Sequence, residues 1–305
     1  MDIVRFKGGL GNQMFQYAFL KSLSSYNRDV RGSLGFYRKN VNTASFSLTD
    51  VFDNVKFELV DDSVFEDIDH KWKRIKQNKD KLALFVKDYP NRFFWVEDPQ
   101  GTFNKHIFET ENCVFIGYWQ TEKYFSHIRR ELLEDFVFSE GEVQLSRMKE
   151  AFLRAENYVS IHIRRGDYLE FSENYGDICT WDYYSAAIEY IKKIIKNPIF
   201  VFCSDDINWT KEHYKMKEAI YIEPGMFECY QPWYDMCLMS CCSSNIIANS
   251  SFSWWGAWLN QRSDKKVVAP TPWFHNYNMP DICPDDWVRF NNKGKRVINK
   301  FFKVV

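Results

Sequence analysis

The sequence predicts an α/β protein of two domains, each built on a parallel sheet. The chain has 305 residues, enough for one large domain or for two domains of roughly 150 residues. In both halves, short apolar segments with strand character alternate with segments of helical periodicity. Such alternation is typical of parallel sheets covered by helices, and its presence in both halves favours two domains.

The first half opens with a strand, a glycine-rich loop and a helix. Residues 3–6 are predicted as the strand, and residues 8–13, with the sequence GGLGNQ, as the loop. Phe15, Phe19 and Leu23 then recur every four residues, as side chains on one face of a helix do. The loop is therefore expected at a turn from strand to helix.

A further strand and a long polar stretch complete the first half. Residues 114–118 are predicted as a strand, and residues 126–157 have a polar, helical pattern. We expect the domain boundary within this polar stretch, near residue 150. The predicted domains are residues 1–150 and residues 151–305.

The second half alternates strands and helices. Its predicted strands are 158–163, 199–203 and 245–248, and its predicted helices are 181–196, 230–242 and 251–261. Pro198 ends the first of these helices. Ligands of parallel α/β folds bind at the carboxyl ends of the strands, so polar residues that directly follow a strand are the candidates for a site.

The composition is that of a folded and nearly neutral protein. Lys and Arg number 40 against 41 Asp and Glu, and 45% of the residues are hydrophobic. These values exclude a disordered or collagen-like chain, and the lack of a basic excess argues against a nucleic-acid partner. Aromatic residues make up 18% of the chain. We interpret them first as a large core, with stacking against sugar rings as the alternative.

Localisation and cysteine chemistry follow from simple patterns. The sequence contains no apolar segment of membrane-spanning length, and the N-terminus lacks the apolar region of a signal peptide, so we expect a cytoplasmic protein. The eight cysteines form no CxxC pair. We interpret them as buried free thiols, with a metal or disulfide role as the alternative.

Residues 70–87 form a basic stretch with seven Lys and Arg among apolar residues. A solvated helix or loop is the simpler interpretation. The alternative is a surface that contacts anionic lipid or an anionic acceptor, which would make the protein peripheral at the inner face of the membrane.

Four polar clusters each follow a predicted strand directly. The first is the loop of residues 8–13, whose glycines let a ligand approach the backbone and whose helix attracts anions at its N-terminus. It is neither a dinucleotide fingerprint nor a P-loop, because Met14 occupies the third glycine position and no Gly-Lys-Ser/Thr follows. A plain tight turn explains this loop about as well.

The second cluster, residues 162–168, has the sequence HIRRGDY. Adjacent arginines at a strand end point in different directions, so one can bind phosphate oxygens as a fork while the other pairs with Asp167. His162 alternates with Arg164 along the strand, so both can meet one ligand. The alternative is a purely structural Arg–Asp pair.

The third cluster is Ser204-Asp205-Asp206, and the fourth is residues 249–258, with the sequence NSSFSWWGAW. The two carboxylates can bind a metal, ribose hydroxyls or the N–H groups of guanine, or one of them can cap the next helix. The serines of the fourth cluster can cap a helix or bind phosphate, and its three tryptophans are interpreted as core. Together, clusters two to four fit a site for a nucleoside diphosphate.

With these motifs the chain resembles the α-1,2-fucosyltransferase family, the glycosyltransferases that make galactoside 2-α-L-fucosides. The similar segments are 8–18, 117–120, 124–125, 162–168, 200–206 and 246–258, together with the regions around Trp273 and Trp287. The resemblance implies a GT-B-like fold, in which two Rossmann-like domains face a central cleft. Residues 1–150 would be the acceptor-side domain, and residues 151–305 the GDP-fucose-binding domain.

The resemblance also implies an activity. The expected reaction is an inverting, metal-independent transfer of L-fucose from GDP-β-L-fucose to the 2-hydroxyl of a galactose-terminated oligosaccharide or lipid-linked glycan. GDP-fucose is then a substrate, and neither a cofactor nor a metal is expected. The alternatives are another acceptor or linkage, such as α-1,3, and an inactive protein that binds a sugar nucleotide or a glycan.

The resemblance assigns roles to individual residues. The expected donor-binding residues are Arg164, Arg165, Asp167, His162, Asp205, Asp206, Ser251, Ser253, Gly9 and Gly11. Arg164 is expected at the β-phosphate, His162 against the nucleotide, and either Asp205 or Asp206 at the guanine. Asn12 is expected near the fucose and the acceptor, which makes Arg164, His162 and Asn12 the catalytic candidates.

The second strand departs from the family pattern. Family members often have an Asp there, whereas this chain has Gly32-Ser33. An acceptor contact from that strand is therefore not carried over. No general base is assigned, because His162 has suitable chemistry but lies in the nucleotide motif.

Overall fold

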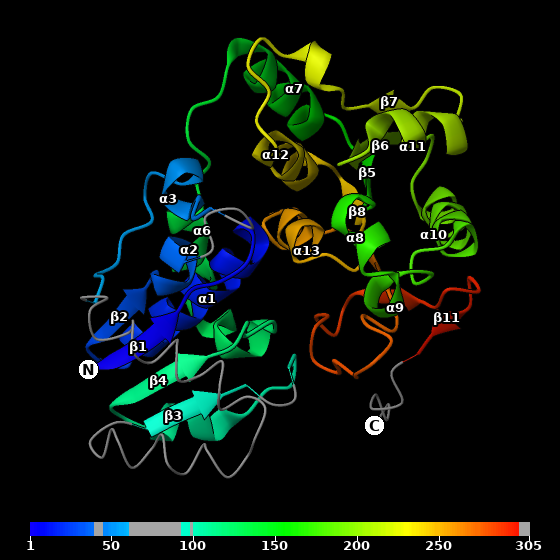
Figure 1. The fold of residues 1–305 in the computed structure, drawn as a ribbon. Coiled ribbons are helices and arrows are strands. Elements are labelled where there is room, and N and C mark those ends of the chain that lie inside the picture. Colours follow the sequence, from blue (N-terminus) through cyan, green and yellow to red (C-terminus); the bar gives the residue numbers. More distant parts are fainter. Residues whose placement is uncertain (40–44, 61–92, 98–99, 299–305) are drawn as a thin grey trace. The chain divides into compact units, whose positions relative to one another are not determined.

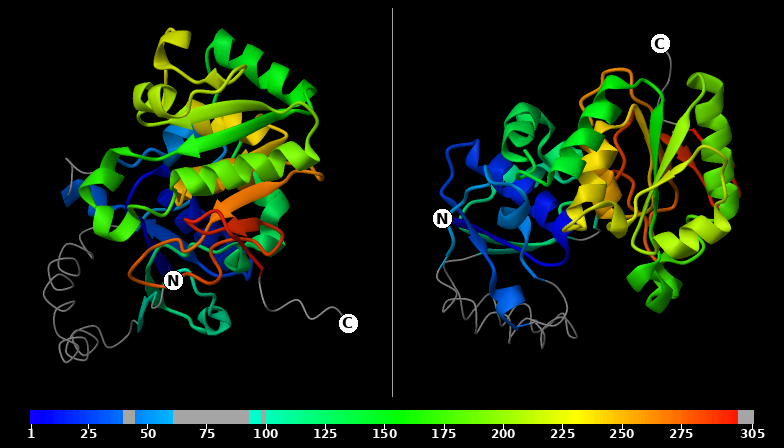
Figure 2. Two further views of the ribbon diagram at one scale, coloured as in Figure 1. Left: turned by 90° about the vertical axis from the view of Figure 1, so that its right-hand side faces the viewer. Right: turned by 90° about the horizontal axis from the view of Figure 1, so that it is seen from above.

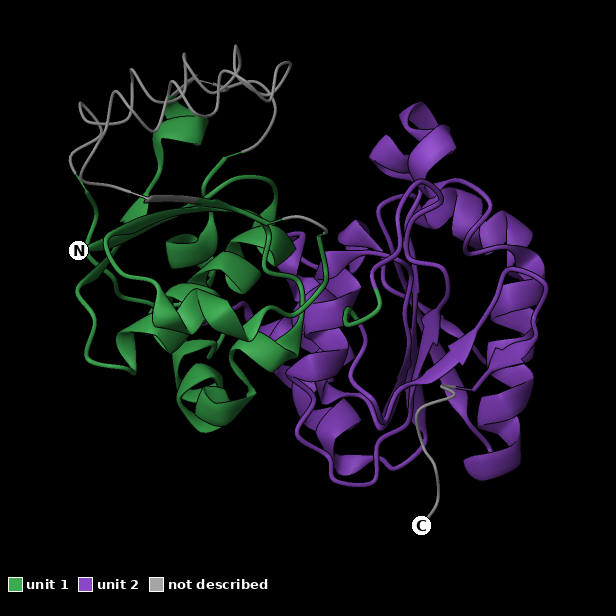
Figure 3. Cartoon of the chain, turned by 90° about the horizontal axis from the view of Figure 1, so that it is seen from below, with its two compact units in different colours: residues 1–139, 280–282 green, residues 140–279, 283–305 purple. Residues whose placement is uncertain are grey.

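The computed structural model describes residues 1–39, 45–60, 93–97 and 100–298, which form two compact units (Figures 1 and 3). Unit 1 comprises residues 1–139 and 280–282, and unit 2 comprises residues 140–279 and 283–305. Each unit has its own sheet, in which all strand pairs are parallel except one at the edge of the unit 2 sheet. The predicted α/β fold of two domains is therefore confirmed.

In the described part of unit 1, the sheet has four parallel strands in the order β2-β1-β4-β3. They are β1 (Asp2–Arg5), β2 (Val30–Ser33), β3 (Phe93–Val96) and β4 (Cys113–Ile116). The central strands β1 and β4 are buried at every position. Both were expected from their apolar sequence, and the structure shifts each by one or two residues.

The helices in the described part of unit 1 are α1 (Leu10–Ser24), α2 (Gly35–Lys39), α3 (Leu48–Val51) and α6 (Arg129–Asp135). Single 3-10 turns are η1 (Lys105–Glu109), η2 (Glu122–Tyr124) and η3 (Ser126–Ile128). Phe15, Phe19 and Leu23 of α1 are fully buried, as their spacing predicts.

The glycine loop forms the predicted turn between β1 and α1. Gly8 has a φ of 81°, which favours glycine, and a Cβ there would lie 2.6 Å from Nδ2 of Asn12. Gly9 is the N-cap of α1, and a Cβ at Gly9 would meet no atom within 4 Å. The loop therefore leaves open space at the backbone just before α1.

Gly32 in β2 has a packing role. A Cβ at this position would lie 2.4 Å from a ring atom of Phe57. That ring stacks on Phe6 with centroids 5.0 Å apart. Any side chain at position 32 would displace Phe57, so the core of unit 1 requires glycine there.

In the described part of unit 2, the sheet has seven strands in the order β11-β10-β9-β8-β5-β6-β7. They are β5 (Tyr158–Ile163), β6 (Ile199–Ser204), β7 (Ile220–Tyr221), β8 (Ser244–Ile246), β9 (Val267–Pro270), β10 (Val288–Phe290) and β11 (Arg296–Val297). All neighbours are parallel except β10 and β11. The predicted strands β5, β6 and β8 lie side by side in the middle.

Helices cover both faces of this sheet, with α10 on one face and α12 and α13 on the other (Figure 2). The helices of unit 2 are α7 (Val143–Arg154), α8 (Gly166–Glu170), α9 (Ser172–Tyr175), α10 (Trp181–Ile194), α11 (Ile207–His213), α12 (Trp233–Cys241) and α13 (Ser251–Trp258), with the 3-10 turn η4 (Pro224–Met226). The three predicted helices correspond to α10, α12 and α13.

The polar stretch of residues 126–157 is not one helix. It contains α6 in unit 1 and α7 in unit 2, separated by an irregular segment. Helix α7 packs against α12 and buries Leu145 and Phe152, so it belongs to the second unit. The structure therefore places the boundary, predicted near residue 150, at 139–140. Residues 280–282 also return to unit 1, which the sequence did not indicate.

The core contains the residues that the sequence assigned to it. Trp254, Trp255 and Trp258 are each at most 2% exposed, so the core interpretation of these tryptophans is confirmed. All eight cysteines are free, and all but Cys179 and Cys229 are buried.

None of the described helices is long and apolar enough to span a membrane. The basic stretch of residues 70–87 lies outside the described residues.

A buried amide network joins the elements of unit 2. The Asn245 side chain is fully buried and donates to Oγ of Ser160 and to the carbonyl of Met239, at 2.7 and 2.8 Å. It also accepts a hydrogen bond from Asn260 at 2.9 Å. Asn245→Ala should lower the free energy of unfolding by roughly 2–4 kcal/mol, because two buried polar side chains would lose a partner. Urea denaturation measures this change.

Asn157→Ala is the matched control for this prediction. The Asn157 amide also donates to a carbonyl, that of Asn197, but this bond is exposed to solvent. Its loss should change the free energy of unfolding by well under about 1 kcal/mol. Equal losses in the two variants would contradict the importance assigned to the buried network.

Candidate functional site

The candidate site lies at the carboxyl edge of the unit 2 sheet. Ile163 at the end of β5 pairs with Ser204 at the end of β6. Arg164 and Asp205 therefore leave neighbouring strands at the same level. Strand β8, on the other side of β5, leads into the N-terminus of α13. Clusters two, three and four of the sequence are thus brought to one edge, as predicted.

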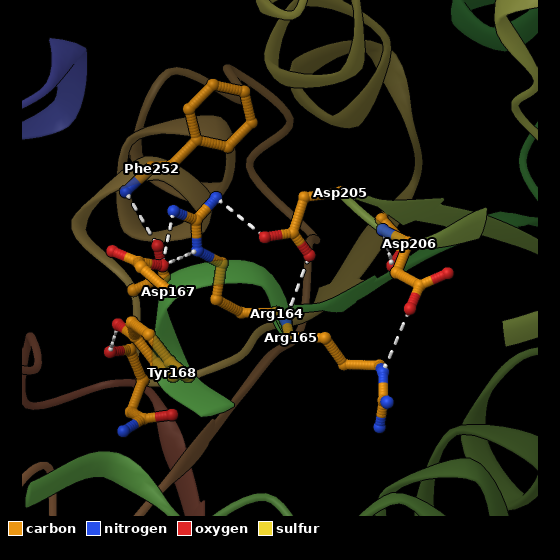
Figure 4. A network of polar contacts seen from close by, with 10 residues as sticks. Arg164, Arg165, Asp167, Tyr168, Asp205, Asp206 and Phe252 are labelled. Carbon is orange, nitrogen blue, oxygen red and sulfur yellow. Dashed lines mark hydrogen bonds and ion pairs between the residues drawn. The ribbon is translucent and has the colours of Figure 1, made fainter. Parts of the chain in front are cut away.

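Arg164 is held between two carboxylates (Figure 4). Its Nε and Nη2 donate to Oδ1 of Asp167 at 3.0 and 2.7 Å, and its Nη1 lies 3.0 Å from Oδ2 of Asp205. These two carboxylates raise the pKa of the guanidinium, against the opposite effect of burial. A guanidinium carries five N–H groups, and these contacts among the described residues use three of them. Arg164 is therefore fixed in place with N–H groups remaining for a ligand.

Arg165 points away from Arg164, toward Asp206 (Figure 4). Its Nε lies 3.2 Å from Oδ2 of Asp206, and its guanidinium stacks 3.6 Å from the centre of the Trp209 ring. The predicted divergence of the two arginines is confirmed. Asp167, however, pairs with Arg164, the arginine expected to bind phosphate, and not with its neighbour.

Asp205 and Asp206 make different contacts. Asp205 Oδ1 accepts the backbone N–H of Arg165 at 2.8 Å, while its other oxygen pairs with Arg164. Gly166 makes room for it, because a Cβ there would lie 2.5 Å from Asp205 Oδ2. Asp206 is the N-cap of α11, so the capping alternative is confirmed for this residue. A guanine contact by either carboxylate stays a prediction.

His162 is deeply buried at the end of β5. It is 2% exposed, and its Nδ1 has no hydrogen-bond partner among the described residues. Burial and the positive charge of Arg164 lower the pKa of its imidazole to about 3. The ring is therefore neutral at physiological pH, and an unpaired ring nitrogen lies next to the Arg164 cluster.

The three serines at the N-terminus of α13 have different environments. Ser250 is the N-cap, with Oγ accepting the N–H of Phe252. Ser253 is fully buried, and its hydroxyl faces the carbonyls of Ala248 and Ser250 at 3.2 Å. Ser251, the first residue of the helix, is partly exposed. A phosphate contact by Ser251 or Ser253 stays a prediction.

Two cavities of unit 2 border this cluster. One of about 580 Å³ lies beside Arg164 and Arg165 and is lined by Tyr168, Trp181 and Trp209, among others. The second, of about 670 Å³, is bordered by Asp205, Asp206 and the segment 223–226. The arginine and aspartate cluster therefore lies beside space that can hold a ligand. Among the described residues, no group of three His, Cys, Asp or Glu could hold a metal ion.

Asp235 is a feature of this region that the sequence reasoning missed. It lies in α12, is 4% exposed and accepts a hydrogen bond from the Tyr230 hydroxyl at 2.9 Å. Burial raises the pKa of its carboxyl to about 7, and the charge of Asp205 acts in the same direction. A lone Asp within an apolar helical segment was the signal in the sequence, since such a residue is buried with its helix.

The predicted residues of the glycine loop belong to unit 1. Gly9 is exposed, whereas Gly11 is buried within α1. Asn12 is partly exposed, and its Oδ1 accepts a hydrogen bond from Gln120 at 2.7 Å. Asn12 thus lies at the carboxyl edge of the first sheet.

Asp235 should make stability depend on pH. Its pKa is 3.8 in the unfolded chain and about 7 in the fold, so its contribution is fully present below pH 3.8 and is lost as pH rises through about 7. Asp235→Asn cannot ionise and should gain stability relative to wild type as pH rises over this interval, measured by denaturation at several pH values. Asp264→Asn, at an exposed position, should keep the wild-type pH dependence. A constant difference between Asp235→Asn and wild type would contradict the raised pKa.

Comparison with known proteins agrees with the motifs. The model of glycosyl transferase family 11 matches residues 1–291. The chain is 33% identical to an alpha-1,2-colitosyltransferase of Escherichia coli, with 94% of this chain and 98% of the relative covered. It is 30% identical to the O-antigen biosynthesis glycosyltransferase WbnK of Escherichia coli, with 92% and 97% covered.

A more distant relative is the galactoside 2-alpha-L-fucosyltransferase SEC1 of Bos taurus, at 24% identity with 90% of this chain and 66% of the relative covered. Among solved structures, the NodZ alpha-1,6-fucosyltransferase co-crystallized with GDP matches with a TM-score of 0.52 and 14% identity, over 97% of this chain and 96% of that one. This likeness concerns the fold alone, and it confirms the predicted GT-B-like architecture of two Rossmann-like domains. On the match of the family model, the chain belongs to glycosyl transferase family 11, and it is a glycosyltransferase.

Proposed function

We propose that the protein transfers L-fucose from GDP-β-L-fucose to the 2-hydroxyl of a galactoside during the synthesis of a surface glycan. The observation that carries this proposal is the Arg164 fork, fixed by Asp167 and Asp205 at the carboxyl edge of unit 2. The names of the relatives support an α-1,2 linkage and a deoxy-sugar donor. The proposed acceptor is a galactose-terminated oligosaccharide or lipid-linked glycan.

Arg164 is proposed to bind the β-phosphate of the donor. Breaking the bond between sugar and phosphate leaves negative charge on that phosphate, and a preorganised guanidinium stabilises this charge in the transition state. The frame of Asp167 and Asp205 fixes the fork before the donor binds, so little reorganisation accompanies the reaction. The N-terminus of α13, close to His162 through Phe252, contributes helix N–H groups to the same region.

The cluster itself is not a strong anion site. Two arginines stand against three aspartates, which gives a net charge of −1 for these five residues. A diphosphate must therefore be recognised by directed N–H groups and not by a general positive field. This favours a fork such as Arg164 over a set of mobile lysines.

His162 is proposed to contact the nucleotide as a neutral hydrogen-bonding group. With a pKa of about 3, its imidazole is a weak base at neutral pH, so the geometry does not favour it as the general base for the acceptor. Its Nδ1, which has no partner among the described residues, can exchange a hydrogen bond with a bound ligand.

The transfer is proposed to be inverting and independent of metal. In this scheme Arg164 and the helix N–H groups supply the positive charge that a metal supplies in other transferases. The acceptor hydroxyl attacks from the face opposite the leaving phosphate, which requires that it be held in line. Asn12 of unit 1 is proposed to approach the fucose and the acceptor.

GDP-colitose is a second candidate for the donor. The relative with 33% identity is named as a colitosyltransferase, and colitose is L-fucose without its 3-hydroxyl. Parallel assays with GDP-L-fucose and GDP-colitose, each with the same galactoside acceptor, distinguish the two donors. The proposal predicts the larger kcat/KM for GDP-L-fucose, and linkage analysis of the product should show an α-1,2 bond. A preference for GDP-colitose of about tenfold or more would replace L-fucose as the donor.

Removal of the fork should weaken binding of GDP. Arg164→Ala should lower the affinity for GDP by roughly 30-fold or more in calorimetry with EDTA present, because the charge-assisted bonds to phosphate are lost. Arg164→Lys should also bind weakly, since a point charge cannot replace the fork.

Arg154→Ala is the matched control for the loss of the fork. Arg154 belongs to the same unit, and its side chain is 81% exposed and paired with Glu150. Its removal should leave the affinity for GDP unchanged. Tight binding of GDP by Arg164→Ala would contradict the assigned role, and wild-type binding that vanishes in EDTA would contradict metal independence.

A further inference from the structure

Glu97 is a buried carboxylate at the carboxyl edge of the unit 1 sheet. It directly follows β3 and is 6% exposed. Its oxygens accept three backbone N–H groups: that of Gly101 on Oε1 at 3.1 Å, and those of Tyr118 and Trp119 on Oε2 at 2.6 and 3.0 Å. Glu97 therefore ties the end of β3 to the turn that follows β4.

The turn of residues 117–120 has a backbone that needs such support. Trp119 has a φ of 58°, a conformation that costs free energy for a bulky residue. A Cβ at Gly117 would lie 2.6 Å from Cβ of Glu97 and 2.7 Å from its Oε2. The carboxylate and the turn are thus packed against each other with no room for a side chain between them.

The turn carries two side chains to the same edge of the sheet. The Tyr118 ring lies 4.0 Å from Nζ of Lys7, and Gln120 donates its hydrogen bond to Asn12. Gln16 of α1 ties the backbones together, because it accepts the N–H of Lys7 and donates to the carbonyl of Gly117. An aromatic face, two amides and an ammonium group are thereby held close together.

We propose that Glu97 is a positioning residue for the acceptor: it fixes the turn of residues 117–120, so that Tyr118, together with Lys7 and Asn12, binds the hydroxyls of the acceptor's terminal sugar. Gln120, which is 6% exposed, orients Asn12 through its hydrogen bond. This inference rests on the proposed function. Ligands of parallel α/β units bind at this edge. Aromatic faces and amide groups are suited to sugar rings and hydroxyls, respectively.

The ionised form of Glu97 is the one that accepts three N–H groups. Burial raises the pKa of this carboxyl, while the three backbone N–H groups and the charge of Lys7 act in the opposite direction. Tyr118 and Tyr124 are further titratable groups near Glu97, and its charge adds to burial in raising the pKa of the Tyr124 phenol. As pH falls into the range where Glu97 gains a proton, its hold on the turn should weaken and the KM for the acceptor should rise.

Glu97→Gln tests the proposal with steady-state kinetics. The side-chain nitrogen of the introduced glutamine cannot accept a hydrogen bond, so at least one backbone N–H that Glu97 binds should lose its partner and the turn should be held less firmly. The variant should raise the KM for a galactoside acceptor about tenfold or more while leaving the affinity for GDP unchanged. The rise of the acceptor KM on acidification that is expected of the wild type should be absent. Gly117→Ala, which displaces the same carboxylate, should reproduce the raised KM.

Asp2→Asn is the matched control. Asp2 is also a buried carboxylate of unit 1, where it pairs with Arg28 and accepts the N–H of Cys113, but it lies at the start of β1. This variant should lose thermal stability without any change in the acceptor KM. Such a result would separate a role in positioning from a role in folding.

The outcomes separate the two proposals. If the wild type transfers fucose and Glu97→Gln keeps the wild-type acceptor KM and its pH dependence, the positioning role is wrong. If Glu97→Gln and Asp2→Asn raise the acceptor KM equally, the effect is one of folding and the positioning role is also wrong. If the wild type transfers sugar to no galactoside, the proposed function fails, and this inference fails with it.

Discussion

Arg164 is fixed between Asp167 and Asp205, and the candidate site of unit 2 depends on this arrangement. The frame exists because β5 and β6 are parallel neighbours, so that Arg164 and Asp205 leave the sheet side by side. Asp205 also accepts the N–H of Arg165, which fixes the backbone that carries both arginines. The same carboxylates that orient the fork reduce the local positive charge, so recognition there depends on direction more than on net charge.

Both units follow the same physical plan. In each, a carboxylate at the carboxyl edge of a parallel sheet accepts the backbone N–H of a neighbouring loop. In unit 2 the solvent-accessible Asp205 accepts that of Arg165, and in unit 1 the buried Glu97 accepts those of Tyr118 and Trp119. Such bonds are stronger than those between neutral groups and limit the movement of the loop. Side chains that must meet a ligand are therefore carried on segments that are already ordered.

The sequence predicted what local patterns determine. Strand β5 and the polar residues after it were found because an apolar run ends abruptly at Arg164, and α1 was found from the spacing of Phe15 and Phe19. Contacts between distant segments were not predicted. The pairing of Arg164 with Asp205 depends on strand register, and the importance of Glu97 depends on N–H groups twenty or so residues away. The break between α6 and α7 was missed because both helices are polar.

A structure of the protein with GDP bound tests the central claim most directly, because it shows which groups meet the β-phosphate. The account predicts the β-phosphate within hydrogen-bond distance of the Arg164 guanidinium, with the fork still held by a carboxylate. GDP bound with its phosphates away from Arg164, for example only along the segment 223–226 that borders the neighbouring cavity, would contradict the account.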